Sequence, residues 1–428
     1  MVIVEGIRVT PVLIEDPPLL NVVGVHQPYV PRAIIELHTD VGVVGLGETY
    51  GDAHILHWLE RAATALRGTS LFDLNLLSDR VSAALRDQAG ATAQGGLTRL
   101  HGANLTGEMS VRRAANIVTA AFEVAYLDAQ GRLLGLPVHA LLGGKLRDCV
   151  EFSGYLFYRW AAYPGARADS WGEALAPEGI VAQARRMVSE YGFRSLKLKG
   201  GVLDPDVEIA TVHALRAAFP DHALRIDPNT GWSVETSLRV ADELDGVLEY
   251  LEDPTPGLKG MATVAHRATM PLATNMCVTG FEHLPEAIER GSVSVVLSDH
   301  HFWGGLRATQ RLSGICQTWG IALSMHSNSH LGVSLAAMTH LGAVLPTISY
   351  ACDTHRPWQT EDVVRGTPLP IVDGAIAVPD SPGLGVDLDP GALAALHQRW
   401  LDSDVRVRDD EAAMRAVHPN WAPALPRF

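Results

Sequence analysis

Residues 195–199 read SLKLK, residues 223–227 read ALRID and residues 248–252 read LEYLE, and each of these short runs ends in a charged residue. Helical patterns follow the runs along the chain. The full series of apolar or β-branched runs is 149–157, 195–199, 223–227, 248–252, 271–275, 293–299, 321–326 and 346–353. Strands that alternate with helices predict a parallel sheet, and eight such units predict a closed α/β barrel. An open doubly wound sheet is the alternative.

The residues on either side of this series predict a second unit of the α+β class. Its predicted strands are 2–14, 32–38 and 43–48, and its predicted helices are 53–67, 73–86 and 110–134. Residues 89–109 are rich in Gly, Ala and Thr and predict a loop. The tail beyond residue 360 is too short for a core of its own, so we expect it to pack against the first unit. The predicted division is a capping domain at 1–145, a barrel at 146–365 and a returning C-terminal segment at 366–428.

Composition excludes several classes of partner. The formal net charge of −14 makes nucleic acid an unlikely ligand, because phosphate binding needs a basic surface. The four cysteines lie far apart in the sequence, which fits neither a disulfide framework nor a CxxC pair. We expect no signal peptide, and the sequence has no apolar run long enough to cross a membrane. We therefore expect a cytoplasmic protein that binds a small molecule, and we expect it to form a homo-oligomer.

Polar side chains recur where the predicted strands end. Consecutive positions are 23 to 28 residues apart, which is one strand–helix unit each. The C-terminal ends of barrel strands face one mouth, where barrel enzymes carry their chemistry. We therefore expect these side chains to share one site: Lys197, Lys199, Asp227, Glu252, Asn275, Asp299, His326 and Asp353.

Three residues on successive predicted strands have the chemistry of a metal site. Asp227, Glu252 and Asn275 offer two carboxylates and an amide oxygen, which are hard ligands suited to Mg²⁺. In the alternative interpretation, Asp227 and Glu252 only cap the following helices, since Pro228 and Pro254 lie close behind them. The regular spacing of the three residues favours the metal site.

Groups that can carry protons flank this predicted metal site. Lys197 and Lys199 are two apart on one strand and share a face, so each is expected to lower the proton affinity of the other. One of them could then act as a base. Asp299 and His326 lie one unit apart, and a carboxylate beside an imidazole fixes its tautomer and orientation. The spacing gives no such support to three other histidines, His300, His301 and His330.

Such a site suits removal of a proton from the carbon next to a carboxylate. The proton is weakly acidic, and its loss builds a second negative charge in an enediolate. A divalent cation and a neighbouring ammonium group stabilise that charge. If a hydroxyl occupies the next carbon, an acid on the opposite side can protonate it and expel water; otherwise that acid can return a proton to the carbon.

The chain resembles the enolase superfamily, and within it the glucarate dehydratase group, over nearly its whole length. Two segments are specific to that group, HSNSH at 326–330 and DTHRPWQ at 353–359. The other similar segments are SLKLKGG (195–201), RIDPNTGW (225–232), LEDP (251–254), PLATNM (271–276), SDHHFWGG (298–305) and the remainder of 325–343.

The resemblance implies a (β/α)7β barrel of the TIM type with an α+β capping domain built from both termini. It also implies a Mg²⁺-dependent acid-sugar dehydratase with D-glucarate as the leading substrate. Lys199 would be one base, and His326, oriented by Asp299, would be the opposite base and the acid for the leaving hydroxyl. Asp227, Glu252 and Asn275 would hold the metal. Asn229 would lie beside the metal, and the substrate contacts would be Lys197, His26, Tyr155, Ser327, Asn328, His355 and Arg408.

The chain departs from the group in two places that concern the substrate. Loop 89–109 does not match well, and MCVTGF follows Asn275 where the group more often has an acidic residue and a tryptophan. The alternative function is therefore a dehydratase or epimerase of a different acid sugar. A metal-dependent barrel hydrolase would need an HxH pair near the first strand, and 149–160 contains no histidine. The non-enzyme alternative is a catalytically idle relative that serves as an interaction protein. Such a protein would not need all of the catalytic and metal-binding residues named above.

Overall fold

The N-terminal part of the computed structural model is an antiparallel sheet covered by helices. The structure describes residues 1–86, 111–367 and 369–428, so the predicted loop 89–109 lies outside the described residues. The sheet has the order β1-β4-β5, and a small ribbon precedes β4. The strands are β1 (Val4–Glu15), β2 (Leu20–Asn21), β3 (Gly24–Val25), β4 (Tyr29–Thr39) and β5 (Val44–Tyr50), and the helices are α1 (Ala53–Leu66), α2 (Leu74–Arg86) and α5 (Val111–Leu134).

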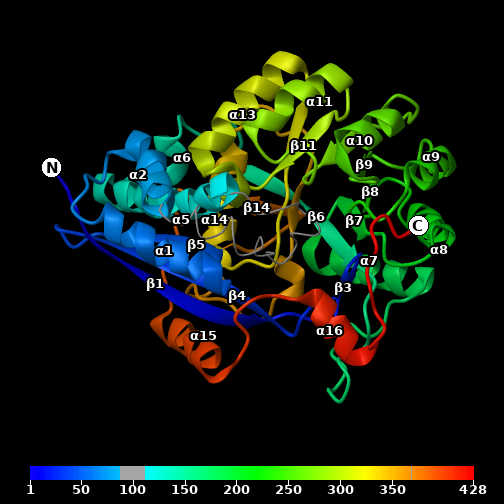
Figure 1. Cartoon of the computed structure of the whole chain (residues 1–428), viewed down its shortest axis with the longest axis horizontal. Helices are drawn as coiled ribbons and strands as arrows, with labels where there is room; N and C mark the ends of the chain where they lie inside the picture. Colours follow the sequence, from blue (N-terminus) through cyan, green and yellow to red (C-terminus); the bar gives the residue numbers. More distant parts are fainter. Residues whose placement is uncertain (87–110, 368) are drawn as a thin grey trace.

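The central part is a parallel barrel, which lies beside the N-terminal sheet (Figure 1). All eight predicted strands form, in the hydrogen-bonded order β12-β11-β10-β9-β8-β7-β6-β13. They are β6 (Cys149–Phe157), β7 (Ser195–Lys199), β8 (Ala223–Asp227), β9 (Tyr250–Glu252), β10 (Leu272–Thr274), β11 (Val295–Ser298), β12 (Ala322–Met325) and β13 (Cys352–Thr354).

Backbone hydrogen bonds bring the two ends of this sheet together. Leu323 of β12 donates to the carbonyl of Thr347 at 3.0 Å and accepts from the amide of Ser349 at 3.1 Å, just before β13. β13 in turn pairs with β6 in parallel. The alternative of an open doubly wound sheet is therefore wrong, and the sheet is a nearly closed barrel.

Helices follow the first seven barrel strands, and only a short 3-10 turn, η2 (Arg356–Trp358), follows the eighth, as expected for a (β/α)7β barrel. The helix α14 is buried along its whole length and contacts both the barrel and the N-terminal sheet. The principal helices are α7 (Pro177–Tyr191), α8 (Pro205–Ala218), α9 (Val234–Glu243), α10 (Gly257–Ala265), α11 (Leu284–Arg290), α13 (Leu306–Trp319) and α14 (Gly332–Val344). The shorter ones are α6 (Val138–Leu141), η1 (Phe281–His283) and α12 (His300–Trp303).

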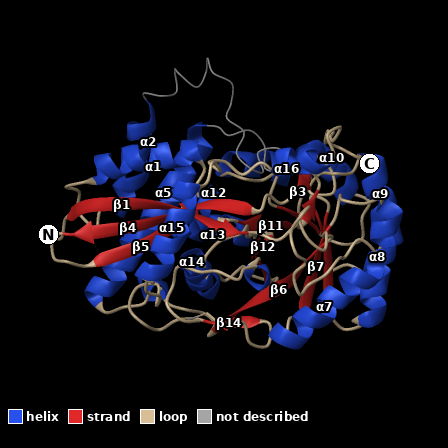
Figure 2. Ribbon diagram, turned by 90° about the horizontal axis from the view of Figure 1, so that it is seen from below, coloured by secondary structure: helices blue, strands red, loops and turns tan. Residues whose placement is uncertain are grey.

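The C-terminal segment returns to the N-terminal sheet. Helix α15 (Pro390–Asp402) packs along β1, where His397 Nδ1 lies 2.7 Å from the carbonyl oxygen of Pro11. Helix α16 (Asp410–Val417) lies beside β3, and Figure 2 shows these elements from below. The segment also contacts the barrel, since β14 (Ala375–Ala377) pairs with β6 and the amide of Phe428 donates to Gly231. The residue bounds of the three predicted domains stay a prediction.

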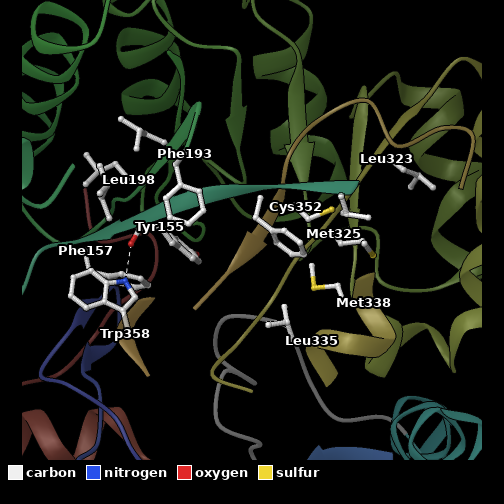
Figure 3. Packing of buried hydrophobic residues seen from close by; sticks show 14 of the residues in the cluster. Tyr155, Phe157, Phe193, Leu198, Leu323, Met325, Leu335, Met338, Cys352 and Trp358 are labelled. Carbon is white, nitrogen blue, oxygen red and sulfur yellow. Dashed lines mark hydrogen bonds between the residues drawn. The ribbon is translucent and has the colours of Figure 1, made fainter. Parts of the chain in front are cut away.

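A buried apolar cluster includes aromatic side chains at the mouth of the barrel (Figure 3). Tyr155, Phe157 and Trp358 pack together in it, and the indole N–H of Trp358 donates to the carbonyl of Tyr155 at 2.8 Å. This contact joins the first barrel strand to the turn that follows the last one. Among the described helices, none is both long enough and apolar enough to cross a membrane.

A buried acid at the joint between α5 and α13 is expected to make folding stability depend on pH. Burial raises the pKa of Glu123 to about 7, although it accepts a hydrogen bond from the amide of Arg307. Because the folded-state pKa exceeds that of the unfolded chain, the stabilising contribution is complete below pH 4.5 and is lost as the pH rises through 7. The loss is about 3 kcal/mol for a shift of this size.

The variant Glu123→Gln tests this expectation, because its amide carries no charge at any pH. Its free energy of unfolding in guanidinium chloride should improve relative to the unsubstituted protein between pH 5 and pH 8. A difference that is constant across this range would contradict the prediction.

Candidate active site

Three of the strand-end carboxylates converge around the ammonium group of Lys197. Its Nζ lies 2.6 Å from Glu252 Oε2, 2.7 Å from Asp353 Oδ2 and 3.4 Å from Asp227 Oδ2. All four side chains are fully buried. The strands β7, β8, β9 and β13 therefore direct these groups to one point inside the mouth of the barrel, as their spacing predicts.

The second lysine of the pair lies beside the first barrel strand. Lys199 Nζ donates to Tyr155 Oη at 3.0 Å and to Asp227 Oδ2 at 2.8 Å. Burial raises the pKa of the Tyr155 hydroxyl well above its usual value, and the carboxylates of Asp227 and Asp353 act in the same direction. Tyr155 therefore stays protonated beside Lys199.

The carboxylates of the site differ in their proton affinity. Burial alone would raise the pKa of Asp227, but the neighbouring Lys199 and Lys197 bring it down to about 2. Burial and the charge of Asp227 raise the pKa of Glu252 well above its usual value. When all three are ionised, the carboxylates of Asp227, Glu252 and Asp353 outnumber the two ammonium groups by one, and a cation that binds there would favour the ionised form of Glu252.

The expectation that the two lysines lower the pKa of each other is wrong for Lys197. Burial acts in that direction, but Asp353 and Glu252 outweigh it and raise its pKa well above the usual value. The sequence pattern shows that the lysines share a face, and it does not show that the last barrel strand brings Asp353 against the first of them.

The residues expected to hold a metal fit a hard divalent cation. Asp227, Glu252 and Asn275 are buried and converge, and the Asn275 amide nitrogen lies 3.3 Å from Glu252 Oε1. Asn229 donates to Asp227 Oδ1 at 2.8 Å, and its own Oδ1 is buried without a hydrogen-bond partner among the described residues. Two carboxylates, amide oxygens and surplus negative charge are what Mg²⁺ prefers in proteins.

The alternative interpretation, in which Asp227 and Glu252 cap helices, is wrong. Helix α9 is capped by Ser233, whose hydroxyl accepts from the amide of Thr236, and α10 begins after Pro256. Neither helix uses the strand-end carboxylate, so both carboxylates remain available inside the barrel mouth.

The backbone after β8 and β9 is strained where it presents these groups. Asn229, Thr230 and Asp253 have φ values of 47°, 61° and 35°, in the left-handed region that costs energy for residues other than glycine. Asp253 accepts hydrogen bonds from the Thr274 hydroxyl at 2.5 Å and from the Asn275 amide at 2.8 Å. This contact fixes the end of β10 and the place of Asn275.

The predicted histidine–aspartate pair forms on β11 and β12. His326 Nδ1 lies 3.2 Å from Asp299 Oδ2. The other oxygen, Oδ1, accepts from the amide of His301 at 3.0 Å and lies 2.7 Å from His301 Nδ1. Burial would raise the pKa of Asp299, but His301 and His326 bring it well below its usual value, so Asp299 is a carboxylate.

The residues expected to contact substrate fall into two groups around this site. Ser327 Oγ lies 3.3 Å from His355 Nδ1, and the His355 ring packs on Tyr155 at 4.8 Å. Asn328 donates to Tyr50 Oη at 2.7 Å. Burial, with His26 and His326 nearby, lowers the pKa of His355 well below its usual value, so this ring is neutral.

The second group comes from the terminal segments. His26 Nδ1 lies 3.0 Å from Asp16 Oδ2, and the Arg408 guanidinium pairs with Asp16 at 3.3 Å and with Asp410 at 3.0 Å. These side chains are buried, and the His26 ring lies 5.6 Å from the ring of Phe157, which in turn lies 5.5 Å from the ring of His355, so the two groups are neighbours. The N-terminal and C-terminal segments thus close one side of the mouth.

Comparison with known proteins shows to which family the chain belongs. Residues 179–392 match the family described as Enolase C-terminal domain-like. The chain is 54% identical, over 99% of both chains, to a probable glucarate dehydratase of Streptomyces coelicolor. The chain belongs to the enolase superfamily. It is an enzyme, and it is similar to a lyase of that superfamily.

Solved structures of this superfamily are similar over the whole chain. An enolase of Mycobacterium smegmatis complexed with tartrate is 55% identical, covers 100% of this chain and 99% of its own, and superposes with a TM-score of 0.94. An enolase of Thermobispora bispora complexed with magnesium and formate is 53% identical, covers 100% of both chains and has a TM-score of 0.95. The magnesium of the second structure agrees with a divalent metal site in this superfamily member.

Three residues of this site, Asp253, Tyr50 and His301, were not predicted from the sequence to belong to it, and a fourth was predicted to reach it without a role. Asp353 ends a strand at the regular spacing, which is a signal that sequence reasoning noted without giving the residue a role. Asp253 and Tyr50 carry no such signal. His301 was set aside, although an aspartate that begins a helix commonly accepts from the residue two positions on, as Asp299 does here.

Proposed function

We propose that the protein is a Mg²⁺-dependent acid-sugar dehydratase with D-glucarate as its leading substrate. The observation that supports the proposal is that two different proton-handling groups, each against its own buried carboxylate, come from the C-terminal ends of barrel strands. Lys199 contacts Asp227 from β7, and His326 is oriented by Asp299 at the ends of β11 and β12. We also propose a cytoplasmic homo-oligomer that acts on small acid sugars.

The metal would be held by Asp227, Glu252 and Asn275, with Asn229 beside it. When bound, it supplies a Lewis acid that stabilises negative charge on the carboxylate of the substrate. Lys197 would contact the same carboxylate. The fully buried ammonium group keeps its proton because of Glu252 and Asp353, so it acts as a fixed positive charge rather than a base.

Lys199 and His326 would carry out the proton transfers. Lys199 or His326, depending on the configuration of the substrate, takes the proton from the carbon next to the carboxylate, and the electron pair left behind forms an enediolate. The bond from the adjacent carbon to its hydroxyl then breaks, and His326 donates the proton that makes the leaving group water. The resulting enol becomes a 2-keto acid by moving one proton from oxygen to carbon.

The remaining side chains would select the substrate. Tyr155, Ser327, Asn328 and His355 would contact its hydroxyl groups, and His26 and Arg408 would contact its far end. The 54% identity to a probable glucarate dehydratase supports D-glucarate. The sequence MCVTGF after Asn275 departs from that group and favours a dehydratase or epimerase of a different acid sugar as the second candidate.

A panel of acid sugars with Mg²⁺ tests the proposal. Diacids and mono-acids are incubated with the enzyme, and formation of a 2-keto product is followed, with EDTA as the metal-free control. We expect dehydration of D-glucarate that EDTA stops and added Mg²⁺ restores. Activity on mono-acids alone would overturn D-glucarate as the substrate, and activity that survives EDTA would overturn the metal site.

A further inference from the structure

A carboxylate of the N-terminal sheet holds the start of a barrel helix. Glu48 of β5 accepts hydrogen bonds from the amides of Leu331 and Ser334, both at 2.8 Å, where α14 begins. Glu48 is itself paired with the buried guanidinium of Arg32. A carboxylate at this position satisfies amides that the helix leaves unpaired and interacts favourably with its dipole.

The same strand also holds the loop that carries His326. Tyr50 lies two residues after Glu48 on β5, so both side chains point to one face, and Tyr50 Oη accepts from Asn328 at 2.7 Å. Asp16, ahead of β2, accepts from the Ser329 hydroxyl at 3.1 Å. Residues 326–334 are therefore held at three points by side chains of the N-terminal segment.

A line of hydrogen bonds runs from this anchored helix to the candidate acid. The Ser334 hydroxyl lies 3.0 Å from His301 Nε2, and His301 Nδ1 lies 2.7 Å from Asp299 Oδ1. Asp299 Oδ2 faces His326 Nδ1. Every member of the line is buried. His301 thus occupies one oxygen of Asp299 and leaves the other for His326.

We propose that Glu48, Ser334 and His301 are positioning residues that fix Asp299 and, through it, the ring of His326. The inference rests on the proposed function, because it assigns these residues to the proton transfers of His326. Without the bond to Ser334, the His301 ring can turn about its side-chain bonds, and Asp299 Oδ1 then keeps only the hydrogen bond from the His301 amide, which holds the carboxylate less firmly. His326 would then lose the orientation that directs its other nitrogen, Nε2, toward the substrate.

The geometry predicts a specific effect on turnover. Ser334→Ala removes one hydroxyl and keeps the backbone amide that Glu48 accepts, so the variant should fold. We expect kcat for the acid sugar that the enzyme dehydrates to fall about 10- to 100-fold, as for other residues that orient a reacting group through a neighbour. The KM should change little, because Ser334 does not line the substrate.

A matched control is Ser313→Ala. Ser313 is also a buried serine, and it lies on α13, away from the site. Its hydroxyl lies 2.7 Å from the hydroxyl of Thr347. This control should keep its kcat. An equal loss in the two variants, or a rise in KM with an unchanged kcat in Ser334→Ala, would overturn the proposal.

A double-substitution cycle tests whether the residues act as one line. The variants are Ser334→Ala, His301→Asn and the two combined. If Ser334 acts through His301, the combined variant should be no slower than His301→Asn alone, so the effects on kcat are not additive. Additive losses would mean that Ser334 and His301 act separately and would overturn the proposal.

A measurement without substrate separates this inference from the proposed function. Proton NMR of the uncomplexed enzyme should show low-field imidazole N–H signals that His301→Asn and His326→Asn assign to their rings. Ser334→Ala should shift both signals, and Ser313→Ala should shift neither. If the panel of acid sugars finds no dehydration, the proposed function fails, and this spectrum still decides the positioning. An unmoved His326 signal in Ser334→Ala would refute it.

Discussion

The variant His326→Asn is expected to lose dehydration. Its amide can still donate to Asp299 Oδ2, so the hydrogen bond that His326 makes at 3.2 Å can be kept. The amide cannot take up or release a proton near neutral pH, and a positioned acid–base group is worth about 10²- to 10⁴-fold in rate. The measurement is the rate of 2-keto product formation from D-glucarate at saturating Mg²⁺.

The control for this variant is His340→Asn. His340 is also buried, but it lies on α14, its ring stacks with His139 and its Nε2 lies 3.2 Å from the carbonyl oxygen of Leu384. It has none of the contacts of the strand-end cluster. This variant should keep kcat even if it unfolds at a lower temperature. Full dehydration by His326→Asn would mean that another residue delivers the proton.

The barrel could be predicted from the sequence because each strand carries its own local signal. The runs ending at Lys199, Asp227 and Glu252 are apolar, short and followed by helical periodicity, and the structure confirms strands at all three. The ends were placed better than the starts. The apolar run from Leu248 begins two residues before β9. Apolar residues indicate which part of the chain is buried, whereas a strand also requires hydrogen bonds to a neighbouring strand.

The contacts across the barrel could not be predicted in this way. Lys197 pairs with Asp353, which is 156 residues further along the chain. That pair exists because β13 closes against β6, and closure depends on the whole sheet rather than on any local pattern. The sequence therefore indicates which residues reach the mouth, and the fold decides which of them touch.

The contribution of the N-terminal sheet to the site was also beyond sequence reasoning. Glu48 and Tyr50 lie in an ordinary strand pattern, and nothing local shows that they meet residues 326–334. His301 is a different case, since its contact with Asp299 is local and an aspartate at a helix start is a recognisable signal. The regular spacing predicts a contact of Asp299 with His326 and does not predict the shorter contact with His301.

The variant Lys199→Ala is expected to lose dehydration as completely as His326→Asn, because the substitution removes two functions at once. Lys199 is a candidate base, and it is also one of the two ammonium groups that hold the pKa of Asp227 near 2. Its removal takes away a proton acceptor and a positive charge from the place where the enediolate forms. The measurement is product formation from D-glucarate, together with exchange of the substrate α-proton in D₂O.

Two further variants separate the base from the charge. Lys199→Arg keeps the positive charge but does not release a proton near neutral pH, so it should bind substrate and remain inactive. Lys259→Ala changes an exposed lysine on α10 and should leave both rates unchanged. Dehydration by Lys199→Arg at the unsubstituted rate would show that Lys199 serves only as a charge, and His326 would then be the sole base of the site.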